Sequence, residues 1–191
     1  MGDIFREIDE ELRQERYEKL WQKYGRFFVG AAVAVIVGFA GWQGWTHYDK
    51  SQREAASAQY ASALRLAAEG KNSEAASLFA SLAEKGGNSY GVLSRFHQAA
   101  LKAKAGDLAG AAADYQAIAA ETGVESTLRD AALLFSVSHA MDQANADPQA
   151  LLGRLEPLVA GTGPWRHSAQ ELSGLLKLRT GDEAGAKAQF Q

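Results

Sequence analysis

The chain has 191 residues, three prolines and no cysteine, and its 20 Lys and Arg against 23 Asp and Glu give a net charge of −3. The absence of cysteine excludes disulfides and thiol chemistry. The near balance of charge leaves no basic stripe for nucleic acid, so we expect no nucleic-acid partner.

Residues 1–26 form a charged head. Apolar side chains recur in it at helical spacing and predict an amphipathic helix over 3–24 that lies on the inner leaflet, docks a partner or packs on its own. These side chains are Ile4, Ile8, Leu12, Leu20, Trp21 and Tyr24.

Residues 27–45 read FFVGAAVAVIVGFAGWQGW, nineteen residues without a charge. A helix of this length spans about 28 Å, close to the hydrocarbon thickness of a bilayer. The run therefore predicts a single transmembrane helix. A buried helix of a soluble protein is the first alternative. A cleaved signal peptide is the second, but the head is too long and too acidic for one.

The flanking cations predict the orientation of this span. Five precede it within fourteen residues, whereas the nearest ones after it are Lys50 and Arg53. Because Lys and Arg are retained in the cytoplasm, we expect a cytoplasmic N-terminus and an exported body. The five are Arg13, Arg16, Lys19, Lys23 and Arg26.

Small residues line one face of the span. Gly30, Ala34 and Gly38 recur every four residues, a spacing that allows a second transmembrane helix to approach closely. Glycine is also common in spans without any such contact.

The body, residues 46–191, has fourteen Lys and Arg against sixteen Asp and Glu. Its apolar residues recur at helical spacing, so it is predicted to be all-α. The expected helices, the first of which continues from the span, cover 26–66, 72–85, 89–105, 108–121, 127–144, 148–160, 165–180 and 182–191.

Three segments of the body repeat one pattern: Gly, then Ala five residues on, then an aromatic nine on. They begin at Gly70, Gly106 and Gly181, and a degenerate copy is expected near Asn145, with Ala150 in the small position. Each Gly is expected to end a helix in a left-handed conformation, each Ala to allow close helix contact, and each aromatic to lie between neighbouring units.

The first two segments begin 36 residues apart. Helical pairs that recur at about this interval are typical of tetratricopeptide (TPR) repeats. The sequence thus predicts an all-α chain: an N-terminal single transmembrane helix followed by a TPR-like α-solenoid of about four helix pairs. An irregular alanine-rich bundle is the alternative.

No catalytic or metal-binding motif is recognisable. The four histidines are scattered, and no phosphate loop or nucleophile elbow is present. We therefore expect neither enzymatic activity, nor a cofactor, nor a small-molecule substrate.

One polar ridge is a candidate protein-binding site. Arg95, Gln98 and Lys102 share one face of a first helix, which in TPR stacks lines the concave side, while Phe96, Ala99 and Ala103 are expected to face the core. A merely solvated face is the alternative.

The head DIFREIDEELRQERYEKLWQKYG, followed by one span and alanine-rich helical pairs, resembles the ancillary SecYEG translocon subunit family (YfgM-like) in its alphaproteobacterial form. The resemblance implies a bacterial inner-membrane protein with a periplasmic TPR-like domain. It also implies association with the SecYEG translocon and with a membrane-anchored periplasmic chaperone of the prolyl-isomerase type. A TPR scaffold for envelope assembly or cell division is the alternative function.

Overall fold

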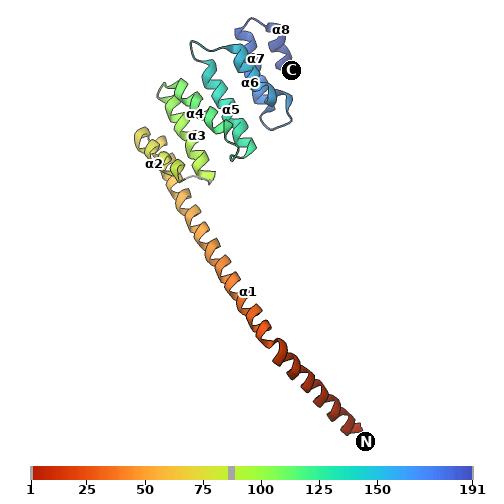
Figure 1. The fold of residues 1–191 in the computed structure, drawn as a ribbon. Helices are drawn as coiled ribbons and strands as arrows, with labels where there is room; N and C mark the ends of the chain where they lie inside the picture. Colours follow the sequence, from red (N-terminus) through yellow and green to blue (C-terminus); the bar gives the residue numbers. More distant parts are fainter. Residues whose placement is uncertain (1, 86–88, 191) are drawn as a thin grey trace. The chain divides into compact units, whose positions relative to one another are not determined.

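The computed structural model describes residues 2–85 and 89–190, with side chains from residue 21 onward. Eight helices, and no strand, occur in those ranges (Figure 1). The chain divides into two compact units, Met1–Glu54 and Ala55–Gln191, which are described separately below.

Helix α1, Gly2–Ala68, runs through the whole first unit. The two helices predicted over 3–24 and 26–66 are therefore one helix. Gly25 does not interrupt it, because a glycine weakens a helix by about 1 kcal/mol relative to alanine but keeps helical backbone angles. The ring of Trp21 lies over it, only 3.2 Å from where a Cβ on Gly25 would be.

Apolar side chains of the first unit are exposed. Phe28, Val35 and Trp45 are each more than two-thirds accessible within this single chain. The predicted amphipathic face at Ile4, Ile8, Leu12 and Leu20 concerns side chains outside the described part of the chain.

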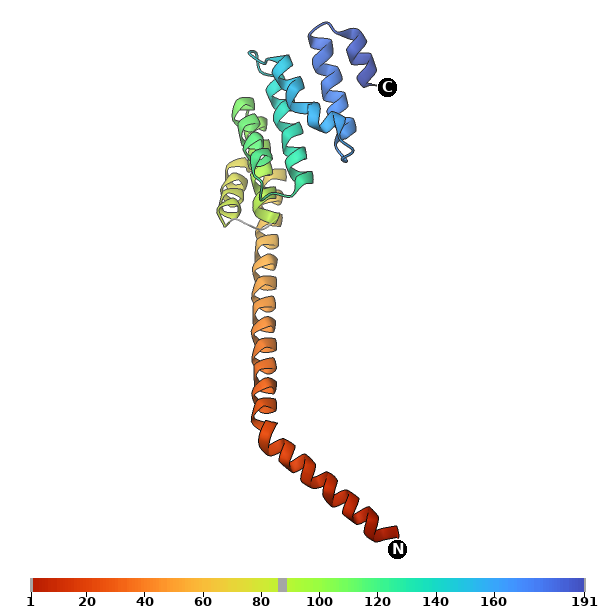
Figure 2. The ribbon, with the colours of Figure 1, turned by 45° about the vertical axis from the view of Figure 1, so that its right-hand side comes forward.

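The second unit consists of antiparallel helix pairs. The last turns of α1 pair with α2, and α3/α4, α5/α6 and α7/α8 follow, stacked in chain order (Figure 1, Figure 2). Most boundaries lie within two residues of those predicted, but α5 ends three residues early. The helices are α2 Asn72–Glu84, α3 Ser89–Lys104, α4 Leu108–Ala120, α5 Ser126–Met141, α6 Pro148–Ala160, α7 Arg166–Arg179 and α8 Glu183–Gln189.

The repeated glycines end helices as predicted. Gly70, Gly106 and Gly181 have φ angles of 80°, 90° and 80°, in the left-handed region that glycine enters without steric cost. After two of them an aspartate caps the next helix: Asp107 Oδ1 accepts from Gly110 N at 2.8 Å, and Asp182 Oδ1 accepts from Gly185 N at 2.9 Å.

The degenerate third copy lies one residue away from its predicted register. Ala150, expected in the small buried position, is exposed, and Leu151 is buried there instead. The reason is that Asp147 caps α6 as Asp107 caps α4, and the buried positions follow four and eight residues after the cap. Leu155, fully buried, thus takes the aromatic position. Asn145 does not have the left-handed backbone of the repeated glycines.

The repeated alanines and aromatics form the joints between helices. Ala75, Ala111 and Ala186 are at most 1% exposed. Phe79 of α2 packs edge-on against Tyr60 of α1 at 5.8 Å between ring centroids and stacks on His97 of the next pair at 4.9 Å. The predicted position of the aromatic between neighbouring units is confirmed here.

The second pair repeats this joint. Tyr115 of α4 packs edge-on against Phe96 of α3 at 5.5 Å and stacks on His139 of α5 at 5.7 Å. The core is accordingly three successive clusters, over α1–α3, α3–α5 and α5–α7, as expected for a stack in which each unit contacts its neighbours.

Candidate protein-binding groove

A groove of about 570 Å³ lies within the first two repeats, between α2, α3 and α4. The predicted ridge lines it: Arg95, Gln98 and Lys102 all contribute from α3. The rest of the lining is Asn72, Ser73 and Ala76 from α2, Leu101 and Ala105 from α3 and its end, and Asp114 and Ala117 from α4.

The ridge occupies one face of α3, as predicted, but this face turns toward the second helices of the pairs. The aromatic face of α3 contacts the first helices instead, through His97 to Tyr60 of α1 and Phe96 to Phe135 of α5. That the ridge lines the concave side of the stack stays a prediction. Of the residues expected in the core, Ala99 is fully buried, and Phe96 and Ala103 are partly buried.

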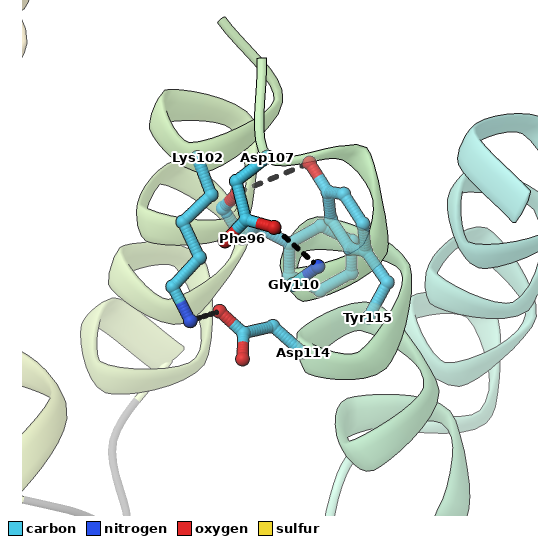
Figure 3. Close-up of polar contacts among 6 residues, drawn as sticks. All are labelled: Phe96, Lys102, Asp107, Gly110, Asp114 and Tyr115. Carbon is cyan, nitrogen blue, oxygen red and sulfur yellow. Dashed lines mark hydrogen bonds and ion pairs between the residues drawn. The ribbon is translucent and has the colours of Figure 1, made fainter. Parts of the chain in front are cut away.

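Two ion pairs join the ridge to α4. Lys102 Nζ lies 2.6 Å from Asp114 Oδ2, and Arg95 Nη1 lies 2.5 Å from Glu121 Oε2 (Figure 3 shows the first pair). All four side chains are between a quarter and a half exposed, so solvent screens both pairs and each stabilises the fold by about 1 kcal/mol at most. The groove thus presents charges of both signs, and a partner that binds them would disturb little of the stability of the fold.

Local hydrogen bonds fix α4 beside the groove (Figure 3). The Asp107 cap begins the helix, and the Tyr115 hydroxyl donates to the carbonyl oxygen of Phe96 at 3.1 Å. Burial raises the pKa of Tyr115, so the hydroxyl stays protonated and available as a donor. Asp114 is in this way held opposite Lys102.

A second cavity of about 360 Å³ is lined by both residues of the Arg95–Glu121 pair. Arg95 lines both cavities, and the smaller one extends to Val124 and Leu128 at the start of α5. Arg95 is therefore common to both cavities, whereas Glu121 lines only the smaller one.

A family model described as a tetratricopeptide repeat-like domain matches residues 18–191. The chain belongs to this family. Comparison with curated proteins and comparison with solved structures each gave no significant match. The tetratricopeptide repeat-like assignment agrees with the helix pairs, the glycine turns and the aromatic joints described above.

A tetratricopeptide repeat-like domain is a protein-interaction scaffold and is typically non-catalytic. Side chains of the described residues form no cluster of three or more His, Asp or Glu suited to a metal ion. The groove offers polar and charged groups on a packed helical frame, which suits recognition of a protein segment.

The predicted small face of the span lies in the first unit. Gly30, Ala34 and Gly38 are exposed, and a Cβ placed on either glycine would meet no atom within 4 Å. A neighbouring helix would find room there; the contact itself stays a prediction.

The carboxylates that pair with the ridge were not predicted from the sequence. Asp114 lies directly before the aromatic of its repeat. The corresponding residues are Leu78 in the first copy and Gln189 in the last. Because the copies share only the glycine, the alanine and the aromatic, the repeat pattern does not single out this position. Glu121 follows the last residue of α4 and gave no signal either.

Proposed function

We propose that this chain is a single-pass protein of the bacterial inner membrane, with residues 1–26 in the cytoplasm, residues 27–45 in the bilayer and the repeat domain in the periplasm. α1 is the one helix of the described residues that is long and apolar enough to cross a membrane, and its side chains there are exposed. The excess of cations before the span supports the orientation.

Its proposed function is to bind proteins beside the SecYEG translocon, together with a membrane-anchored chaperone of the prolyl-isomerase type, and so to assist exported proteins. The observation that supports this most is an exposed apolar helix in the same chain as a repeat domain with a polar groove. The resemblance of the head to the translocon-associated family supplies the named partners. A scaffold for envelope assembly or cell division would use the same features.

In this proposal the ridge Arg95, Gln98 and Lys102 contacts the periplasmic partner, and Gly30, Ala34 and Gly38 contact a helix of a membrane partner. A tether serves such contacts because confinement raises the effective concentration of a weakly bound partner. Replacing the small residues by leucine is then expected to reduce capture without preventing membrane insertion.

The deciding experiment is crosslinking in intact membranes followed by co-purification. Translocon and chaperone subunits are expected; division or wall proteins in their place would favour the alternative. Reporter fusions active only outside the cytoplasm test the topology, and an inactive reporter after Gln191 with normal expression would reverse the orientation.

Variants of the groove make the test specific. The double variant Lys102→Asp/Asp114→Lys keeps the ion pair but exchanges the two charges, so the fold should persist while capture falls. Lys187→Glu, at an exposed position of α8, is the matched control. Equal capture by both variants would remove the groove from the proposal.

A further inference from the structure

Arg154 of α6 differs from the other arginines that join neighbouring helices. Arg95 and Arg179, like Lys102, each pair with a carboxylate. Arg154 has no carboxylate within 4 Å in the part of the chain that the structure describes; its Nη2 donates to the neutral oxygens of Gln116 on α4 and Ser136 on α5, the latter at 2.8 Å.

This guanidinium is held firmly through one nitrogen. Ser136 is 1% exposed, and its hydroxyl donates in turn to the carbonyl oxygen of Ala112 at 2.8 Å. Within the described residues, the Nε and Nη1 groups of Arg154 have no hydrogen-bond partner. Burial lowers the pKa of Arg154, which shows that the charge is partly removed from water without an opposite charge to compensate.

Arg129 places a second such cation on the same side of α5. It precedes Ser136 by seven residues, two helical turns or about 10 Å, so both residues project toward the same neighbours. The Arg129 Nε is buried without a partner among the described residues. The acid nearest to it in sequence on the preceding turn, Glu125, accepts from the amides of Thr127 and Leu128 instead.

We propose that Arg129 and Arg154 form a carboxylate-binding site, the arginine site, for an acidic segment of a protein partner. A guanidinium presents a planar fork of donors that matches a carboxylate, and a partly desolvated cation gains most from an opposite charge. Small exposed residues of α4, Ala109, Ala113 and Ala120, leave room for such a segment beside it.

A protein carboxylate fits these features better than a polyphosphate. The two arginines stand alone in a domain that has more Asp and Glu than Lys and Arg, and they belong to no basic stripe of the kind that nucleic acid requires. The site is distinct from the groove between α2 and α4, where both cations already have carboxylate partners.

The test uses the full-length chain in neutral detergent and a fluorescein-labelled peptide of six Glu-Ala repeats, with a Gln-Ala twin as the neutral probe. At low salt the glutamate peptide should bind and the glutamine peptide should not. Arg154→Gln and Arg129→Gln should each weaken binding about tenfold, as expected for loss of a charge-assisted hydrogen bond. Arg166→Gln, which removes an exposed cation, should change it less than twofold.

A second measurement separates binding from folding. Arg154→Met removes an uncompensated charge while Ser136 keeps its bond to Ala112, so the melting temperature should stay equal or rise while peptide binding falls. Absence of glutamate-peptide binding, equal loss in the Arg166 variant, or a melting temperature that falls in proportion to binding would each overturn the proposal. So would arginine-dependent binding to phosphatidylglycerol vesicles with unchanged peptide affinity, which would indicate a lipid headgroup.

Discussion

Phe79 and Phe190 occupy the same repeat position but differ in burial, and this difference predicts how much each ring contributes to stability. Phe79 is fully buried between Tyr60 and His97, whereas Phe190 packs over Gly174 on one side and is 50% exposed. Phe79→Ala should therefore destabilise the repeat domain much more than Phe190→Ala.

The magnitudes follow from the burial. Truncating a buried phenylalanine costs about 3–5 kcal/mol, and the two ring contacts of Phe79 favour the upper half of that range. Half of the Phe190 side chain already contacts water, so Phe190→Ala should lower the free energy of unfolding by only about 1.5–2 kcal/mol. With about 3–5 °C of melting temperature per kcal/mol in a domain of this size, Phe79→Ala should melt at least about 12 °C lower than the wild type and Phe190→Ala about 5–10 °C lower.

The assay is near-ultraviolet circular dichroism of the full-length chain during heating in detergent, which reports tertiary packing of the tyrosines and tryptophans. Phe79→Leu should recover part of the loss, since it restores volume without the ring contacts. Equal shifts for the two alanine variants would refute the assignment of Phe79 to a joint between neighbouring repeats.

Three further tests concern a partly buried histidine, the helix caps and a tight helix contact. Burial lowers the pKa of His97, so on acidification this residue takes up a proton in the unfolded chain before it does in the folded one. The stability of the fold should therefore fall as the pH drops below about 6.5. His97→Phe should make the melting temperature depend less on pH in that range. Asp107→Ala should lower the free energy of unfolding, measured with denaturant, by about 1 kcal/mol. Lys71→Asp supplies the side-chain cap that α2 lacks and should raise it by about 0.5–1 kcal/mol. A lower free energy of unfolding for Lys71→Asp would contradict the capping argument. Ala111→Trp should destabilise by about 1–3 kcal/mol or more because the site is fully buried, with the exposed Ala109→Trp nearly neutral; equal melting of both would argue against a tight contact at Ala111.

The regular features of the fold could be predicted from the sequence because they depend on local chemistry. The left-handed turns need glycine, so Gly70, Gly106 and Gly181 marked three helix ends correctly. The joints need a small residue and a ring four residues apart, which Ala75 and Phe79 supply. Such patterns are visible because each repeat presents them again.

Features that depend on tertiary context were missed. The third copy has the cap and spacing of the others but leucines in the buried positions, so the pattern of alanine and a ring predicts Ala150, one residue too early. Helical periodicity predicts that Arg95 and Lys102 share a face of α3, but it cannot show that this face meets the second helices α2 and α4. Gln116 and Ser136, which hold Arg154, lie far from it in sequence and follow no repeat pattern.

The shifted register of the third copy has a practical consequence. The N-cap positions Lys71 and Asp107 are 36 residues apart and Asp147 and Asp182 are 35 apart, but Asp107 and Asp147 are separated by 40. The segment between α5 and α6 thus holds additional residues, mostly exposed, while Leu151 and Leu155 still reach the core. A chain that already tolerates extra length at this connection should accept an epitope tag or a fluorophore near Asn145, which offers a place to label the domain without touching the groove or the arginine site.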